Sequence, residues 1–429
     1  MRGDAKQLRS VVPTTTELRT NGRSQLDAAA ALSDIASLRV PSKPLRILHY
    51  LPVFRYEQGG PIRAVTDLSQ AFLRLGHDVT VATSDATDWP AEWLDAPAGS
   101  RVVRLLKLPE PAMPGGFFSP PQLKEIEPLL DGFDVLHLHL VWVSSNAQLA
   151  ALARARNVPY IVSLRGTLDD WSMSRGTIKK RVFLALTGRD MLEKAATVHC
   201  TARLESEQSF KWFPRGNATV IPNLMDLEPF RKLPGPELAR QKFGIPADGT
   251  PLLLFLSRIQ EKKGVEVLLR AAKILRERGV KFRLAIAGTG AQEYVERNRA
   301  LKRDLQLQES VTFVGHVGGQ EKYSLYEAAD LFVLPTSQEN FGFVFFESLA
   351  AGTPVVTTPL VDTAEDLVAS GGAVLAEQNP EAFADAIARL LADPLTLAQM
   401  SNRGREWTFR ELDPVRIVRE FERMYGSLA

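Results

Sequence analysis

The stretch DLFVLPTSQENFGFVFFESLAAGTPVVTT, from Asp330 to Thr358, decides the fold. Two short apolar runs, 330–336 and 353–358, enclose a helix-length segment from Gly342 to Ala351. Apolar runs of this length are typical of strands buried on both faces, and a helix between two of them is typical of a parallel sheet. The stretch therefore predicts one strand–helix–strand unit of an α/β protein.

The same alternation extends from this unit through most of the chain. In the same half, strands are expected at 251–257, 282–288 and 311–317, with a helix from Gly264 to Arg278. In the first half, strands are expected at 45–52, 77–83, 133–140, 160–166, 196–202 and 218–223, with a helix from Ile62 to Leu75. The pattern predicts two doubly wound, Rossmann-like domains. Such folds bind ligands at the carboxyl ends of their strands, so two facing domains predict an inter-domain cleft.

The proline-bearing segment RKLPGPE (231–237) separates the two sets of strands. We place an N-terminal domain at 44–230 and a C-terminal domain at 236–408. Residues 1–43 are polar and lack a sustained period, apart from a weak helix pattern at 24–38, and we interpret them as a flexible leader. The last helix, within 413–429, can serve either domain, and packing back on the first is one of the two options.

The composition excludes several classes of function. The 429 residues carry a net charge of +2, without the basic excess of a dedicated nucleic-acid binder. Cys200 is the sole cysteine, so the chain forms no internal disulfide and no cysteine-based zinc site. No apolar run is long enough to span a bilayer, and Asp27 and Asp34 interrupt the stretch closest to a signal peptide. We therefore expect a cytoplasmic location.

A first candidate site follows the strand at 251–257. The strand ends at Ser257-Arg258, and Lys263-Gly264 opens the next helix five residues later. A guanidinium, an ammonium and the free N–H groups of a helix start suit a multiply charged anion such as a diphosphate. The alternative is that both cations are merely solvated, as most surface lysines and arginines are.

The loop before the helix of the opening stretch supplies a second cluster. Glu339 and Glu347 lie eight positions apart, on either side of Gly342. A glycine lets the backbone approach a ligand, so the amides of Phe343 and Val344 can bind phosphate or sugar oxygens. Carboxylates accept hydrogen bonds from the vicinal hydroxyls of a ribose or hexose. The alternative is that the two glutamates only complement a helix dipole, an effect worth about 0.3–1 kcal/mol.

Together these motifs resemble the signature of glycosyltransferase family four. Like the family's pattern, residues 335–356 hold two glutamates with seven residues between them, ahead of a small-residue helix and Gly-x-Pro-Val-Val. The spacing from Arg258 to Lys263 and the Gly-Thr-Gly run at 288–290 are also similar. The segment IPNLMDLEPF (221–230) differs from the family, which usually has Asn-Gly-Val-Asp there. The resemblance covers about residues 45–429.

The resemblance implies a GT-B fold, in which two Rossmann-like domains face each other and the second holds most of the donor. It implies that Arg258 and Lys263 neutralise a donor diphosphate, and that Glu347 holds the ribose. It also implies that Glu339 contacts hydroxyls of the transferred sugar and that backbone around His316 and Val317 faces the base. The catalytic candidates are then Glu339, Arg258 and Lys263. The donor-binding candidates are Arg258, Lys263, Glu347, Gly342, Phe343, Val344, Gly288 and Val317.

The activity that the resemblance implies is transfer of a sugar from a nucleotide-diphosphate sugar with retention of the anomeric configuration. In the family, departure and attack occur on one face, and the leaving phosphate accepts the acceptor's proton. The chain has no Asp-x-Asp motif, so we expect fixed cations rather than a metal to stabilise the departing diphosphate, and no cofactor. We expect a glycan or lipid-linked acceptor, in surface polysaccharide or glycoconjugate biosynthesis. The sugar, the nucleotide, the acceptor and the oligomeric state stay open.

The first half contributes candidates for the acceptor and phosphate side of the cleft. Gly59-Gly60 matches the family's glycine-rich loop, and Arg63 follows at the helix start. The alternative for the glycine pair is a turn that needs positive φ. His139 ends the strand at 133–140 and is expected to point into the cleft, although a lone histidine is usually structural.

Arg165 is a departure from the family, which often has a histidine at this place. An arginine cannot act as a general base at neutral pH. We expect Arg165 to bind an anionic sugar, a phosphate or the acceptor.

Two rival functions share this pattern. A sugar-nucleotide epimerase has the same architecture but would consume a sugar nucleotide without any acceptor, and a non-catalytic relative would only bind. A nicotinamide site is excluded because the run at 288–290 lacks the third glycine of the dinucleotide fingerprint. The basic stretch at 175–194 is either a membrane-surface helix that reaches a lipid-linked acceptor or a solvated helix that packs on the first domain.

Overall fold

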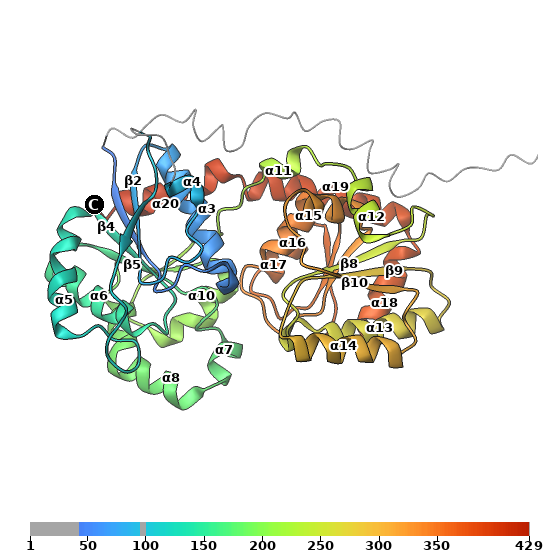
Figure 1. Cartoon of the computed structure of the whole chain (residues 1–429), viewed down its shortest axis with the longest axis horizontal. Coiled ribbons are helices and arrows are strands. Elements are labelled where there is room, and N and C mark those ends of the chain that lie inside the picture. The colour runs from blue at the N-terminus through green and yellow to red at the C-terminus, as the bar shows by residue number, and fades with distance from the viewer. Residues whose placement is uncertain (1–42, 95–99, 429) are drawn as a thin grey trace, which may run out of the picture.

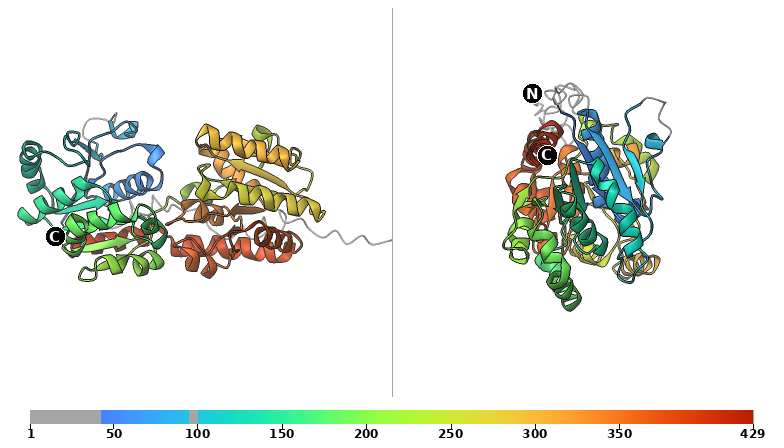
Figure 2. Two further views of the ribbon diagram at one scale, coloured as in Figure 1. Left: turned by 90° about the horizontal axis from the view of Figure 1, so that it is seen from below. Right: turned by 90° about the vertical axis from the view of Figure 1, so that its left-hand side faces the viewer.

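Two parallel sheets, each covered by helices on both faces, form the two domains of the computed structural model, which describes residues 43–94 and 100–428 (Figure 1). The left view of Figure 2, from below, also shows the two domains side by side, and the right view looks along the axis that joins them. The predicted α/β class is confirmed. Apart from Lys43, the expected leader at 1–43 lies outside the described residues.

The first sheet has the strand order β3-β2-β1-β4-β5-β6-β7, and every pairing is parallel. Its strands are β1 Arg46–Tyr50, β2 Asp78–Thr83, β3 Arg104–Lys107, β4 Val135–His139, β5 Tyr160–Ser163, β6 Thr197–Cys200 and β7 Ala218–Val220. All except β3 were expected from the sequence. β3 lies at the sheet edge with mostly exposed side chains, so it lacks the apolar run that identifies a buried strand.

The second sheet has the order β10-β9-β8-β11-β12-β13 and is also parallel throughout. Its strands are β8 Leu252–Leu256, β9 Arg283–Ala287, β10 Val311–Gly315, β11 Leu331–Leu334, β12 Val355–Thr357 and β13 Ala373–Leu375. Only β13, a short and half-buried edge strand, was missed. In both sheets the strand order reverses beside the first strand, where doubly wound folds open a crevice for ligands.

Helices connect the strands and cover both sheets. In the first domain they are α3 Gly60–Arg74, α4 Ala91–Leu94, α5 Pro120–Ile126, α6 Ser144–Ala155, α7 Asp170–Ser174, α8 Thr177–Phe183, α9 Arg189–Glu193 and α10 Arg203–Ser209. From there to the C-terminus they are α11 Glu228–Arg231, α12 Glu237–Phe243, α13 Val265–Glu277, α14 Gln292–Asp304, α15 Gly319–Ala328, α16 Phe343–Ala350, α17 Ala364–Ala369, α18 Pro380–Leu391, α19 Pro394–Glu411 and α20 Pro414–Gly426. Asn379, Asp393 and Asp413 cap the last three helices, each with a proline at the first helical position.

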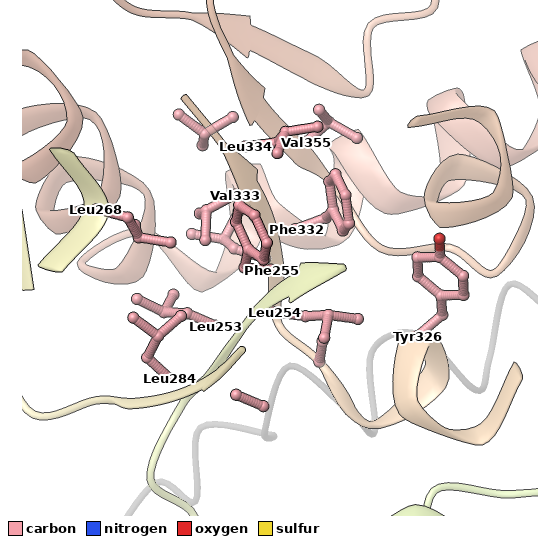
Figure 3. Packing of buried hydrophobic residues seen from close by; sticks show 14 of the residues in the cluster. Leu253, Leu254, Phe255, Leu268, Leu284, Tyr326, Phe332, Val333, Leu334 and Val355 are labelled. Carbon is pink, nitrogen blue, oxygen red and sulfur yellow. The ribbon is translucent and has the colours of Figure 1, made fainter. Parts of the chain in front are cut away.

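The core of the second domain is built from its central strands and the helices beside them. Figure 3 shows Leu253 and Phe255 of β8 packed among Val333 of β11 and Leu268 of α13. These side chains are almost fully buried. Burial of each such side chain stabilises the domain by about 1.5–3 kcal/mol, so the strands stay fixed relative to the loops that follow them.

The chain crosses between the two cores twice. Leu224 packs in a cluster of the first domain and Met225 in the cluster of the second, so the first crossing lies ahead of the 231–237 segment. The second crossing leads from α19 to α20, which Figure 1 shows in red along one side of the molecule. Tyr425 of α20 stacks on Phe72 of α3 at a ring distance of 5.0 Å, so the last helix packs on the first domain.

Within the described part of the chain, none of the helices combines the length and apolar character needed to cross a bilayer.

Candidate functional site

A cavity of about 630 Å³ lies between the two domains. The first domain lines it with residues from 56–63 and 165–172 and with Asn223. The second domain lines it with residues from 256–263, 288–289, 316–317 and 338–344. Each of these segments follows the carboxyl end of a strand, which is where facing doubly wound domains are expected to bind a ligand.

Gly264 brings the two predicted motifs of the second domain together. A Cβ atom at this position would lie 2.0 Å from the carbonyl oxygen of Pro335, and the backbone has a φ of +71°. Only glycine therefore lets the loop after β8 approach the loop after β11 so closely. The contact is completed by the Lys262 carbonyl, which accepts hydrogen bonds from Ser337 N at 2.7 Å and Thr336 Oγ1 at 3.0 Å.

Lys263 and Glu339 meet in this contact as an ion pair. Lys263 is 4% exposed, and both residues line the cavity. Burial pushes the pKa of the Glu339 carboxyl upward, but the Lys263 charge and its hydrogen bond outweigh burial and hold the pKa below its usual value. The carboxylate is therefore ionised at neutral pH and accepts hydrogen bonds.

Arg258 lines the cavity from the start of the same loop, two residues after the end of β8. Its Nη1 donates to the carbonyl oxygen of Glu57 at 3.3 Å, and its guanidinium lies beside Gly59. The described residues provide no carboxylate within ion-pair distance of it. An exposed guanidinium without a protein counter-ion is available to a bound anion.

Glu347 does not line the cavity, contrary to the expectation that both glutamates face one ligand. It is 1% exposed, and its carboxylate accepts from Arg63 Nη1 at 2.6 Å, Lys322 Nζ at 2.8 Å and Tyr326 OH at 2.9 Å. Burial alone would raise its pKa, but Arg63 and then Lys322 lower the pKa to about 2. Arg63, from the other domain, thus occupies the carboxylate that the resemblance assigns to the ribose, and that role of Glu347 stays a prediction.

The remaining predicted donor residues do line the cavity: Gly288, Val317, Gly342, Phe343 and Val344. Gly342 has a φ of +68° and precedes the first residue of α16, so the free amides of that helix begin at the cavity. Gly59, Gly60 and Arg63 line it from the first domain, with the Arg63 guanidinium 4.5 Å from the centre of the Phe343 ring.

His139 is fully buried and does not line the cavity, which corrects the expectation that it points into the cleft. It belongs to a group of four buried histidines on one face of the first sheet, His49, His137, His139 and His199, which we name the histidine row. His49 Nδ1 and His139 Nε2 are 3.1 Å apart, and Ser163 Oγ links His137 Nε2 to His199 Nδ1 at 2.7 Å each. Tyr425 OH is hydrogen-bonded to His137 Nδ1 at 2.5 Å.

All four rings of the histidine row are neutral. Burial, and then the charge of Arg165, lowers the pKa of His49 and of His199 to about 3. The pKa values of His137 and His139 are lowered well below their usual range, again mainly by burial. The rings are therefore hydrogen-bonding groups rather than general acids or counter-ions at neutral pH.

The nitrogens of His49, His137 and His139 lie within 4.8 Å of one another, a spacing that a metal ion can use. One contact disfavours a metal ion at this place. Arg165 donates from Nη2 to His139 Nδ1 at 3.2 Å, so a positive charge already lies beside the three histidines. The expectation of a metal-independent protein stays a prediction.

Arg165 lines the cavity as expected, at the end of β5. Its backbone has a φ of +58°, which is strained for a residue with a side chain. Its Nη1 donates to Asn223 Oδ1 at 2.5 Å.

Sequence reasoning missed several lining residues, namely Tyr56, Trp171, Asn223, Lys262, Gln338 and Asn340. Some of them join the domains: Gln338 Nε2 donates to Asp169 Oδ2 at 2.7 Å, and Thr201 Oγ1 donates to Asn340 Oδ1 at 2.9 Å. Their positions in segments that follow strand ends were the one signal in the sequence that could have identified them.

The segment at 175–194 divides into an exposed half and a packed half. Ile178 and Leu186 are 80% and 75% exposed, and the α8 helix has no buried residue. Met191 and Leu192 of α9 are buried in the first domain. Lys179 and Arg181 are exposed beside the apolar side chains of α8.

Two family models match the chain, one in each domain. The model described as "Glycosyl transferase 4-like domain" matches residues 59–224, and the model described as "Glycosyl transferases group 1" matches residues 237–407. Together they cover the cavity-lining residues of both domains except Tyr56 and Gln58.

Curated relatives give a consistent result. The chain is 31% identical over 290 residues to a D-inositol 3-phosphate glycosyltransferase of Saccharomonospora viridis, a match that covers 64% of this chain and 65% of that protein. It is 34% identical over 297 residues to D-inositol 3-phosphate glycosyltransferase 2 of Catenulispora acidiphila, covering 65% of this chain and 67% of that protein. The chain thus spans slightly less than two thirds of the first relative and about two thirds of the second.

Solved structures share the fold of almost the whole chain. A glycosyltransferase of Rickettsia africae superposes with a TM-score of 0.74 at 16% identity, covering 90% of this chain and 99% of that one. Alr3699/HepE of Anabaena, in complex with UDP, superposes with a TM-score of 0.74 at 17% identity, covering 89% and 100%. At such identities the likeness establishes the two-domain fold.

Proposed function

This chain belongs to the group 1 glycosyl transferases of glycosyltransferase family four, and from that premise we propose that it transfers a sugar from a nucleotide-diphosphate sugar to an acceptor with retention of configuration. The observation that carries the proposal is the convergence of Arg258, Lys263 and Glu339 on one cavity between the domains. Two cations suit a diphosphate, and one ionised carboxylate beside them suits sugar hydroxyls.

The donor we propose is a uridine diphosphate sugar. Relatives of the same fold were solved in complex with UDP or UDP-glucose, which supports this choice. The diphosphate lies between Arg258 and Lys263, and the first amides of α16 complete its coordination. The base lies toward His316 and Val317, which also line the cavity.

In the proposed reaction, the bond between the anomeric carbon and the diphosphate oxygen breaks as the acceptor oxygen bonds to the same face of that carbon. The acceptor's proton passes to the departing phosphate oxygen, so no protein base is required. Charge develops on the diphosphate, and the fixed positive groups of Arg258 and Lys263 stabilise it without a metal. Glu339 holds the sugar so that the acceptor approaches from the correct side.

Binding of the ribose by Glu347 requires a rearrangement. Arg63 occupies the Glu347 carboxylate, so the ribose hydroxyls reach it only if Arg63 moves aside. Because Arg63 and Glu347 belong to different domains, we propose that donor binding is coupled to a small change in domain orientation.

Arg258 offers the sharpest test because it is exposed, so its replacement should leave the fold intact. The assay measures release of nucleoside diphosphate from a panel of nucleotide sugars, with and without glycan, lipid-linked and inositol phosphate acceptors. We expect release that requires an acceptor, survives EDTA and falls about 10²–10³-fold in Arg258→Ala. The exposed Arg389→Ala serves as the control and should keep full activity.

Three outcomes would count against the proposal. Consumption of the donor without any acceptor would support an epimerase instead. Full activity of Arg258→Ala would remove the site assignment. An anomeric proton coupling in the product opposite to that of the donor, measured by NMR, would show inversion.

We further propose that the exposed half of 175–194 binds an anionic lipid surface. The helix α8 presents Ile178 and, one turn later, Val182, with Lys179 and Arg181 beside them. Apolar side chains next to basic ones are complementary to the acyl boundary and the anionic headgroups of a bilayer. Co-sedimentation with phosphatidylglycerol vesicles should fall in Ile178→Ser and in Arg181→Glu. Replacement of Leu395, which is 66% exposed elsewhere, by serine should have no effect, and equal binding of all variants would contradict the proposal.

A further inference from the structure

Arg165 carries a positive charge that the protein does not neutralise. Its guanidinium donates to Asn223 Oδ1 and His139 Nδ1, which are both neutral groups, and its Nε is buried without a partner. Among the described residues, no carboxylate lies within ion-pair distance of it. Burial lowers the pKa of Arg165 to about 10, so the side chain is still charged at neutral pH.

The carboxylate of Glu205, whose charge acts on Arg165, is already engaged by other groups. It accepts from Gly166 N at 2.5 Å and from Thr201 N and Oγ1 at 2.6 and 2.9 Å. Glu205 thus holds the backbone at Gly166 and at Thr201 and does not pair with the Arg165 guanidinium. A half-buried cation left in this way, with its Nε fully buried, costs free energy unless a ligand supplies the counter-charge.

A count of the charged side chains that line the cavity also leaves Arg165 without a counter-charge. Of its cationic side chains, Lys263 is paired with Glu339, and Arg63 with Glu347. Arg258, Lys262 and Arg165 have no carboxylate partner among the residues that the structure describes. The diphosphate of a nucleotide sugar carries about two negative charges, so it balances two of these three cations.

Arg165 lies on the sugar side of the cavity. A Cβ atom on the adjacent Gly166 would be 2.8 Å from Cβ of Asn340, which follows Glu339. In contrast, a Cβ atom on Gly59 would be 3.7 Å from the guanidinium of Arg258. The loop that carries Arg165 therefore contacts the loop of the proposed hydroxyl-binding carboxylate, whereas Arg258 contacts the Gly59 loop.

We propose that Arg165 forms a second anion site, which binds a carboxylate or phosphate group carried close to the reacting carbon by the transferred sugar or by the acceptor. The inference rests on the proposed function and narrows its substrate class to one with an anionic group besides the donor diphosphate. His139 and Asn223 are positioning residues, because they hold the guanidinium in place without neutralising it.

The test first identifies the nucleoside diphosphate that binds, by thermal shift. Isothermal titration then compares two pairs of ligands. The first pair consists of two sugars on that nucleoside diphosphate, one charged and one neutral, and probes the transferred sugar. The two sugars are glucuronate and glucose, or mannuronate and mannose if the nucleotide is a guanosine diphosphate. The other pair, inositol 3-phosphate and inositol, is titrated with the nucleotide already bound and so probes the acceptor.

We expect the protein to bind the charged member of one pair about tenfold or more tightly than the neutral member. In Arg165→Gln this preference should fall to within about twofold, and Arg165→Lys should restore part of it. Asn223→Asp is the sharpest variant, because it keeps the shape and the hydrogen bond while placing a carboxylate against Arg165. It should also abolish the preference, and it tests the charge even if Arg165→Gln fails to fold. Arg389→Gln is the control and should keep the preference.

Two results would overturn the inference. One is equal affinity for both members of both pairs. The other is a charge preference that survives in Arg165→Gln or in Asn223→Asp. Failure of every nucleoside diphosphate to bind would refute the proposed function itself, whereas binding without a charge preference refutes only the second anion site.

Discussion

The histidine row predicts that acid unfolds the first domain selectively. His49, His137, His139 and His199 are neutral in the folded protein because burial keeps their pKa values far below 6.5, the value of a solvated histidine. In the unfolded chain each takes up a proton as the pH falls through 6.5. A group with a depressed folded-state pKa contributes stability at high pH that is lost as the pH falls, so the loss begins near pH 6.5 and grows toward pH 3.

The magnitude follows from the four side chains. At pH 5.5, proton binding stabilises each histidine of the unfolded chain by about 1.4 kcal/mol. The four together therefore lower the free energy of unfolding of the first domain by about 5.5 kcal/mol relative to pH 7.5. Asp67, whose pKa burial raises to about 6, opposes this by about 1 kcal/mol, because it gains a proton in the folded state. The net loss of about 4–5 kcal/mol corresponds to a fall of about 10–20 °C in the melting temperature of the domain.

Intrinsic fluorescence can follow the first domain almost alone. The tryptophans at 89, 93, 142, 171 and 212 belong to the first domain, and only Trp407 belongs to the second. The second domain also contains a single histidine, His316, so it supplies an internal control. Thermal melts at pH 7.5 and 5.5, recorded by fluorescence and by calorimetry, should show the first domain moving to lower temperature. The second domain should not move down, because burial raises the pKa of Asp362 to about 8 and its protonation stabilises the folded second domain as the pH falls.

Equal melting temperatures of the first domain at the two pH values would refute the reasoning. So would equal losses in both domains, because the second has no comparable group of buried neutral histidines among its described residues.

Three further predictions follow from single contacts. Gly264→Ala should lower stability by at least about 2 kcal/mol more than Gly279→Ala, because both have a φ near +72° but only the first would place a Cβ atom against Pro335; urea unfolding measures the difference. Glu347→Ala should cost about 3 kcal/mol in the same measurement, since it removes the counter-charge of Lys322 and leaves Arg63 with Asp67 alone, and Glu347→Gln should cost less. Tyr425→Phe should cost about 1–3 kcal/mol by removing the hydroxyl that is hydrogen-bonded to buried His137, and an unchanged midpoint would contradict that role.

The sequence predicted the fold well because both sheets are buried on both faces. A parallel strand such as β8 or β11 reads as an uninterrupted apolar run, and the helices between the runs have clear lengths. The edge strands β3 and β13 were missed for the same reason, since exposed or half-exposed strands do not show such a run.

The site was predicted less completely because its contacts cross between the domains. The Lys263–Glu339 convergence follows from two loops of one sheet, and strand-end positions were sufficient to anticipate it. The ion pair between Arg63 and Glu347 joins residues far apart in the sequence. No local pattern indicates that the Arg63 guanidinium will occupy the Glu347 carboxylate. The same holds for His139, since only the sheet register shows that it lies among other histidines behind Arg165.

The return of α20 to the first domain affects how the protein matures during synthesis. The ribosome completes the first sheet early, but the helix that covers the histidine row is translated only after the second domain. Until α20 has left the ribosome, this polar strip of the sheet lacks both its covering helix and the Tyr425 hydroxyl. The N-terminal domain therefore cannot reach its final packing in the order of translation, and its folding must wait for the second domain to emerge.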